Sequence, residues 1–309
     1  MPSEWERFRD AHGTFEAFLQ KSYLGSGSPV PSNIPPLDAI TCGGFRPGLH
    51  VLGGEPGAGK SALGLYIAML SAMSGTNVMF ASLEMSRTQC MERCLSCLSL
   101  STGRPFGWAR TWELAQRARD RQADALGFGR AHEFLADLME NDPVGRAVAR
   151  MKECCSSLLI ADGQSLHEVG GLEQEARKGR AAGLELLFVD YLQYLSVDGI
   201  TDELARVSTA SKRLNMLGVE LGIPVVALAS CSRAGNAKGK APSMHDFKGS
   251  GDIEYNAVSC MVIDRDPDDG TGTGRRLHVV KDRAGGVTSP ETCIRLRFDG
   301  EHNSFDLTD

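Results

Sequence analysis

The sequence of 309 residues contains no apolar run near the roughly 20 residues that a membrane-spanning helix needs, so it predicts no membrane partner. A secretory signal is also missing, because the first ten residues are polar and charged. There is no excess of positive charge either, since the formal net charge is −6. A broad nucleic-acid-binding surface is usually basic, so this charge argues against one but allows a local basic loop. These features predict a cytoplasmic protein.

Paired cysteines at zinc-binding spacing are missing as well. The nine cysteines are an odd number and are scattered, and without an export signal we expect reduced thiols. Cys94 and Cys97 form one C-x-x-C pair, but no second pair follows at zinc spacing. Together with Cys90 they recur on one face of a helix. We therefore expect buried small side chains here rather than a metal or redox site.

The sequence does contain a phosphate-binding loop, because residues 54–61 fit the pattern G-x-x-x-x-G-K-[ST]. An apolar strand-like segment precedes it at 49–52, and a helical stretch of small and apolar residues follows at 62–72. Glycines let backbone N–H groups close around a phosphate, and the helix N-terminus adds its dipole. The residues expected to contact a nucleoside triphosphate are Gly54, Glu55, Pro56, Gly57, Ala58, Gly59, Lys60, Ser61 and Ala62. Among them, Lys60 is suited to the outer phosphates, and the Ser61 hydroxyl to Mg²⁺.

Strand and helix patterns alternate from residue 37 onward, which predicts an α/β fold with a mostly parallel sheet and flanking helices. The strand-like segments lie at 77–82, 157–161, 184–189 and 225–229, and helical stretches end near 98, 182 and 221. For the last helix we expect a cap at Thr201 and a buried stripe formed by Leu204, Val207, Leu214, Leu217 and Leu221. Beyond Gly251, the segments 257–264, 276–281 and 292–298 predict antiparallel strands.

Three further regions complete the predicted organisation. Residues 1–23 contain an amphipathic helix at 4–20, and 24–36 form a Gly-, Ser- and Pro-rich linker. The helix either folds back on its own domain or docks on a neighbouring subunit, and the sequence leaves both open. Residues 37–309 form the main domain, in which 104–153 is a helical insertion whose arginines we interpret as a solvated face.

Four predicted strands end in residues suited to chemistry. These are the Gly54 loop, Glu84, Asp190 and Ser230. Ligands of open α/β sheets gather at the carboxyl ends of strands, so these residues should converge. Asp190 is suited to hold Mg²⁺ through water, and Glu84 to orient an attacking water as general base. Position alone leaves Glu84 equally open to being a strand-end glutamate in solvent.

Several segments together resemble the RecA-like ATPase domain of DnaB-type replicative helicases. They are Ser-Leu-Glu-Met at 82–85, Asp-Tyr-Leu-Gln at 190–193 and Ile-Pro-Val-Val-Ala-Leu at 223–228, in this order. Residues 246–254 resemble that family's DNA-facing loop, and 281–285 resemble its Lys-x-Arg segment, which acts on the neighbouring subunit. The likeness begins near residue 34, continues through closing strands around 298–306, and is interrupted by the insertion. It implies a RecA-like P-loop NTPase core.

The resemblance also implies roles for individual residues. Glu84 would be the catalytic base, and Lys281 and Arg283 would enter the neighbouring subunit's site, with Arg283 as arginine finger. The implied ligands are ATP, Mg²⁺ and single-stranded DNA, and the implied assembly is a homo-oligomeric ring, a hexamer. The residues that correspond to the DNA-binding loop are Lys238, Lys240, Lys248, Gly249 and Gly251. The expected activity is that of an ATP-dependent DNA helicase or translocase.

Three departures from the family pattern are visible. Ser230 stands where the family usually has a glutamine that senses the γ-phosphate, and Lys248-Gly249 stand where Arg-Glu is usual. Only the 4–20 helix precedes the linker, where replicative helicases have a separate helical domain that recruits primase, so we expect a motor domain standing alone. Ser230 and this difference keep a second function open: a non-unwinding ATPase that acts as loader, repair accessory or regulator. The residues identify no loader or primase.

Overall fold

A nine-stranded sheet organises the part of the chain that the computed structural model describes, which comprises residues 28–111, 113, 116, 140, 142–231, 242–243, 247 and 250–308. Its strands are β1 (Gly48–Gly54), β2 (Val78–Ser82), β3 (Leu158–Ala161), β4 (Leu186–Asp190), β5 (Pro224–Ser230), β6 (Ser259–Arg265), β7 (Gly274–Asp282), β8 (Ile294–Asp299) and β9 (Ser304–Leu307). Their spatial order is β3-β2-β4-β5-β1-β6-β7-β8-β9. The strands from β3 to β6 in that order are parallel, and β7, β8 and β9 each run antiparallel to their neighbours. The predicted fold is confirmed.

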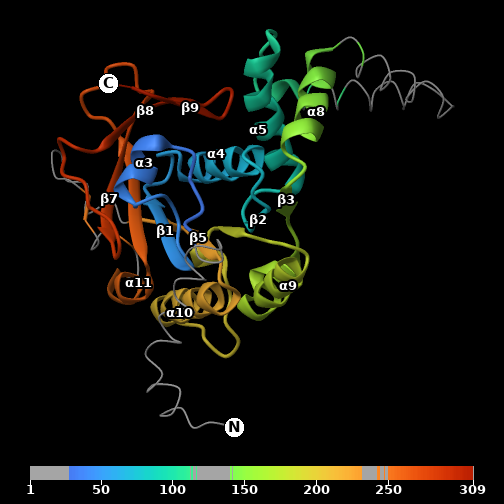
Figure 1. Cartoon of the computed structure of the whole chain (residues 1–309). Helices are drawn as coiled ribbons and strands as arrows, with labels where there is room; N and C mark the ends of the chain where they lie inside the picture. Colours follow the sequence, from blue (N-terminus) through green and yellow to red (C-terminus); the bar gives the residue numbers. More distant parts are fainter. Residues whose placement is uncertain are drawn as a thin grey trace, which may run out of the picture.

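Helices cover both faces of the parallel strands. The described helices are α3 (Pro35–Ile40), α4 (Lys60–Met73), α5 (Arg87–Ser99), α8 (Pro143–Cys154), α9 (Val169–Ala181), α10 (Glu203–Leu221) and α11 (Ser250–Asn256), with short 3-10 turns η1 (Leu100–Thr102), η2 (Gln164–His167) and η3 (Leu192–Tyr194). Figure 1 shows α4 on one side of the strands, and α9 and α10 on the other. Leu52 packs on the α4 side, whereas Leu49 and Val51 pack on the α10 side. The strand sequences are continuously apolar because both faces are buried.

The start of α10 differs from the prediction. Asp202, not Thr201, caps the helix, since its Oδ1 accepts the N–H of Ala205 at 2.8 Å. The predicted stripe is wrong at Leu204, which is 63% exposed because it lies in the first turn and faces solvent. Val207, Leu214 and Leu217 are buried as predicted, and Leu221 is partly buried.

The helix predicted at 166–182 is also shorter than expected. Leu166 belongs to η2, and α9 begins only at Val169. Between them, Glu168 forms a parallel β-bridge with Ser196, which needs an extended backbone and interrupts the helix.

The end of the segment predicted as a linker packs against the main domain. Val30 and Phe45 exchange two backbone hydrogen bonds of 2.8 Å, Ile34 is buried, and α3 begins at Pro35. The predicted 4–20 helix lies outside the described residues.

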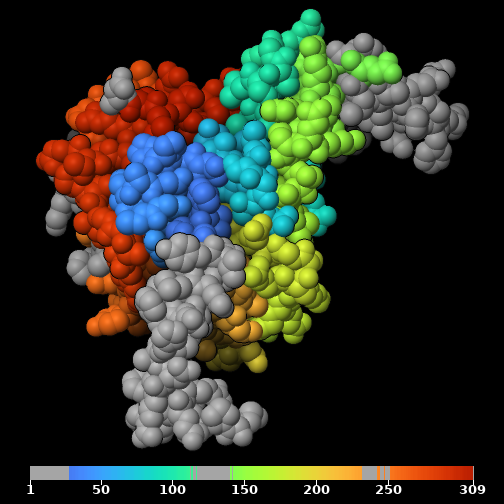
Figure 2. All heavy atoms as spheres, in the orientation of Figure 1, coloured from blue at the N-terminus to red at the C-terminus, as the bar shows by residue number. Residues whose placement is uncertain are grey.

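The insertion is described at its two ends. Phe106, Val144 and Ala147 form a small apolar cluster that joins α8 to α5, and in Figure 2 this helix pair stands out from the body. Along α5, Cys90, Cys94 and Cys97 are buried, which confirms their prediction as core residues. Within the described ranges, no helix is both long and apolar enough to cross a membrane.

Candidate nucleotide-binding site

The carboxyl ends of four adjacent strands, β2, β4, β5 and β1, form one edge of the sheet. Ser82 is level with Asp190, and Gly54 is level with Ser230. The structure therefore brings the Gly54 loop, Glu84, Asp190 and Ser230 to one edge. We call it the phosphate-loop edge.

The loop ends in an open helix N-terminus. Gly59, with φ of 101°, precedes α4 in a left-handed conformation that favours glycine, and no side chain caps the helix. The first turn of this 14-residue helix thus keeps backbone N–H groups that a phosphate can accept. At Gly54, a Cβ atom would lie 2.8 Å from the carbonyl oxygen of Ile263, so only glycine lets the loop leave β1 this close to β6.

Ser61 and Asp190 form the oxygen pair of this edge. The Ser61 hydroxyl donates to Oδ1 of Asp190 at 3.1 Å, while Oδ2 of the fully buried Asp190 has no hydrogen-bond partner in the described part of the chain. Burial raises the pKa of Asp190 to about 6, and the hydrogen bond from Ser61 opposes that shift. A buried carboxylate oxygen without a partner beside a hydroxyl fits Mg²⁺, which prefers hard oxygen ligands.

Lys60 begins α4, and its ammonium lies 5.4 Å from the ring centroid of Tyr191. Tyr191 follows Asp190 directly and contacts Tyr194, with ring centroids 4.4 Å apart. Burial raises the pKa of Tyr191 to about 12, so its hydroxyl stays protonated. The sequence pattern included Tyr191 but indicated no role for it beside the lysine.

Glu84 lies at the tip of the turn between β2 and α5. The Ser82 hydroxyl holds this turn by donating to the Met85 carbonyl at 2.6 Å and accepting the Met85 N–H at 3.2 Å. A capping box between Ser86 and Gln89 then starts α5. The Glu84 side chain is exposed on the phosphate-loop edge, so its role as general base stays a prediction.

Ser230 contacts an amide that sequence reasoning missed. Its backbone N–H donates to Oε1 of Gln193 at 3.2 Å, and the buried Nε2 of Gln193 has no partner among the described residues. The signal was present, because Gln193 closes the Asp-Tyr-Leu-Gln segment, but only the packing of η3 against β5 shows that it reaches Ser230.

The antiparallel strands brace the phosphate loop, which the sequence did not indicate. The buried Arg275, on β7, donates through Nε to the carbonyl of Ala58 at 2.8 Å and through Nη1 to the carbonyls of Gly272 and Gly274. Its guanidinium lies 5.2 Å from the ring of Phe298, which stacks on Phe305. Arg265, at the end of β6, also approaches the loop, with Nη2 3.5 Å from the Gly57 carbonyl.

Lys281 and Arg283 lie away from this edge. β7 runs antiparallel to β6, so that Asp282 is level with Ser259, and Ser259 is level with His50. His50 precedes Gly54 by four residues, which is about 13 Å along a strand. The two cations therefore lie toward the opposite edge of the sheet, which we call the far edge. Their side chains contact carbonyls of residues 254–257 and not the phosphate loop of their own chain.

Of the predicted DNA-binding residues, only Gly251 is described, in the first turn of α11, where it is exposed. Lys238, Lys240, Lys248 and Gly249 lie outside the described residues, so their role stays a prediction.

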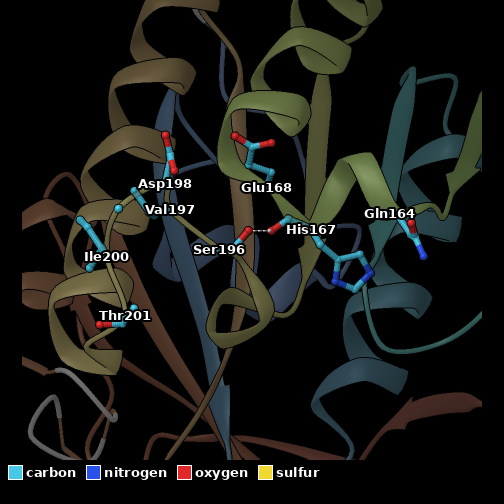
Figure 3. A pocket seen from close by; sticks show the side chains of 9 residues that line it. Gln164, His167, Glu168, Ser196, Val197, Asp198, Ile200 and Thr201 are labelled. Atoms are coloured by element: carbon cyan, nitrogen blue, oxygen red, sulfur yellow. Dashed lines mark hydrogen bonds between the residues drawn. The ribbon is translucent and has the colours of Figure 1, made fainter.

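A separate cavity of about 620 Å³ opens between η2, the start of α9 and residues 196–201. Figure 3 shows its lining, including the hydrogen bond of 3.0 Å from the Ser196 hydroxyl to the His167 carbonyl. The predicted site residues do not line it. It carries the carboxylates of Glu168 and Asp198, so it does not favour a phosphate.

Comparisons with known proteins agree with this architecture. The family described as "DnaB-like helicase C terminal domain" matches residues 29–106 and 129–307. The chain belongs to this family.

Relatives and solved structures support this assignment. The chain is 26% identical over 293 residues to the replicative DNA helicase DnaB of Geobacillus stearothermophilus, covering 89% of this chain and 56% of the relative. The replicative DNA helicase DnaB of Leifsonia xyli is 27% identical, with 91% and 56% covered. The chain thus spans about half the length of these curated relatives.

Two solved structures share the fold. One, a structure of an isolated ATPase domain, superposes with a TM-score of 0.73 at 21% identity, covering 96% of this chain and 98% of that one. A DnaB-like replicative helicase studied with primase superposes with a TM-score of 0.71 at 20% identity, covering 95% and 65%.

Proposed function

We propose that this chain hydrolyses ATP at the interfaces between copies of itself in a ring, as a hexamer, and uses the hydrolysis to move along single-stranded DNA. The observation that carries the proposal is the separation of the two edges. The loop, Ser61 and Asp190 lie at the phosphate-loop edge, while Lys281 and Arg283 lie toward the far edge of the same sheet. A second copy is needed to bring the two sets together.

Each residue has a distinct task in this mechanism. The N–H groups of the loop and α4 bind the phosphates, and Lys60 leaves the Tyr191 ring to contact the outer ones. Ser61 and Asp190 hold Mg²⁺, which neutralises charge on the phosphates when bound. Glu84 orients and deprotonates the attacking water, and Arg283 of the next copy stabilises the charge on the transferring phosphoryl group.

The movement on DNA rests on the family and on the predicted loop. Lysines and backbone N–H groups at 238–251 would follow the phosphates of one strand without reading bases. Several copies would form a basic channel inside a particle whose chain has a net charge of −6.

Mixing two inactive variants tests the interface. Lys60→Ala removes the phosphate lysine, and Arg283→Ala removes the finger, so each pure variant should be inactive. In an equal mixture, an interface that joins the loop of an Arg283→Ala copy to the finger of a Lys60→Ala copy is intact. Random assembly makes this roughly a quarter of interfaces, so about that fraction of the wild-type DNA-stimulated ATPase rate should return. No recovery at concentrations where the chains associate would show that the two residues do not share an interface.

Ser230 is the observation that favours the second candidate, a non-unwinding ATPase. Its hydroxyl is too short to replace a glutamine side chain, although its N–H already contacts the Gln193 amide. Fork unwinding by wild type and Ser230→Gln separates the two functions. If only Ser230→Gln unwinds a fork while both proteins hydrolyse ATP, the natural chain is an ATPase without helicase activity.

A further inference from the structure

Lys281 and Arg283 donate hydrogen bonds to the end of α11. The Lys281 ammonium donates to the carbonyls of Glu254 and Ala257, the latter at 2.9 Å. The Arg283 guanidinium donates to the carbonyl of Tyr255. The two residues assigned to the neighbouring copy's phosphates therefore bind backbone oxygens within their own chain.

These carbonyls need donors. The last four carbonyls of a helix have no partner within it, and they carry the negative end of its dipole. α11 ends at Asn256, so the carbonyls of Glu254 and Tyr255 belong to this group, and that of Ala257 lies just beyond. The Ile253 carbonyl accepts the N–H of Ala257 at 3.0 Å. The two cations thus supply the C-terminal cap of the helix.

The position of Lys281 depends on these acceptors. The residue is half-buried, and burial lowers the pKa of its ammonium. A charged Lys281 needs oxygen atoms around it, which either the α11 carbonyls or phosphates can provide. Arg283 is more exposed and likewise suited to either set.

α11 also connects to the DNA-binding segment. Gly251, one of the predicted DNA contacts, lies in its first turn. Below the cap, Ile253 is fully buried, and the Asn256 amide donates to the Ser211 hydroxyl on α10 at 3.1 Å. Tyr255, in contrast, is 80% exposed. The helix is therefore fixed on one side and held at its end by the two cations.

We propose that Lys281 and Arg283 alternate between the C-terminal carbonyls of their own α11 and the nucleotide phosphates of the neighbouring copy. Nucleotide bound in one copy then loosens α11, and with it the Gly251 contact to DNA, in the next. This rests on the proposed function, because it needs a neighbour whose site receives the two cations. The same two side chains link the state of one ATP site to the grip of the next copy on DNA.

Hydrogen exchange measured by mass spectrometry on the full chain tests the cap. Lys281→Met keeps the length of the side chain but removes its donors, so amides of residues 250–258 should exchange roughly tenfold faster in the variant. The matched control is Arg180→Met, because Arg180 donates to the Leu184 carbonyl just beyond the end of α9. That variant should change exchange near α9 and leave 250–258 unaltered.

A second arm tests the alternation. At concentrations where the chains associate, a non-hydrolysable ATP analogue with Mg²⁺ should accelerate exchange of 250–258 in wild type by a similar factor. The analogue should have no effect on this segment in Lys60→Ala, which cannot hold phosphates, or in Lys281→Met, where the cap is already lost.

The outcomes separate the inference from the proposed function. If Lys281→Met leaves 250–258 unchanged, or if the analogue does so while hydrolysis depends on Arg283 and on concentration, the cations do not alternate and the interface model stands. If hydrolysis depends on neither Arg283 nor concentration, the interface model is wrong and the inference is overturned with it.

Discussion

The two edges of the sheet differ in how complete they are within one chain. At the phosphate-loop edge, Ser61 and Asp190 are already joined by a hydrogen bond, and Arg275 holds the loop from behind. At the far edge, Lys281 and Arg283 carry the charge suited to a phosphoryl group, but they contact only carbonyls of their own chain.

This difference shows that binding and catalysis can be divided between copies. A loop with its helix N-terminus is sufficient to bind a triphosphate. The charge that stabilises the transition state comes from an element that the fold places toward the other edge. Hydrolysis then depends on assembly, whereas nucleotide binding does not. The following changes test the two edges separately.

The largest expected effect is at the far edge. Arg283→Ala should lower the rate of ATP hydrolysis by about a thousandfold or more, the usual range for an arginine finger, and leave nucleotide affinity nearly unchanged. Steady-state hydrolysis and equilibrium titration with a fluorescent ATP analogue give the two values. Arg180→Ala, an arginine far from both edges' chemistry, is the control. A parallel loss of affinity would place Arg283 in its own chain's binding site.

The next effect concerns the support of the phosphate loop. Arg275→Met leaves the carbonyls of Ala58, Gly272 and Gly274 without their donor, and we expect a loss of about 2–4 kcal/mol in the free energy of unfolding. Chemical denaturation measures it. Arg297→Met, on the adjacent strand, removes only an exposed ion pair with Asp306 and should cost less than about 1 kcal/mol. Equal losses would mean that Arg275 does not brace the loop.

At the far edge, His50 predicts a dependence of stability on pH. Burial lowers its pKa from 6.5 to about 4, while Nδ1 contacts the Ser259 hydroxyl and Nε2 the Arg46 carbonyl. The unfolded chain binds a proton near pH 6.5 and the folded chain only near 4. Stability from His50 is therefore full above 6.5 and falls as the pH drops toward 4, by up to about 3 kcal/mol.

The measurement is the difference in unfolding free energy between wild type and His50→Gln from pH 7 to pH 4. Other titrating groups are common to both chains and cancel in this difference. A difference that stays constant with pH would show that the folded chain accommodates a charged His50.

The smallest effect is at the start of α10. Asp202→Ala removes the side chain that caps the helix and should cost about 1 kcal/mol. Thr201→Ala should cost much less, because Thr201 precedes the cap. Thermal unfolding of the two variants compares them directly, and the reverse order would restore the cap predicted from the sequence.

Much of the fold was predictable because local patterns carry it. The apolar strands and the loop around Lys60 follow from residues close together in the chain, and so does the burial of Cys90, Cys94 and Cys97. The errors at Thr201 and Leu204 arose because two adjacent residues were both suitable caps, and a shift by one position turns a side chain by about 100° around a helix.

The sequence by itself determined the phosphate loop, the alternation of strands and helices, and the residues at the strand ends, because each depends on neighbours within a few positions. Only the tertiary structure decided that Arg275 supports the loop, that Gln193 reaches Ser230, and that Lys281 and Arg283 contact the end of α11. These contacts join segments distant in the chain, and the order and direction of strands in the sheet set them.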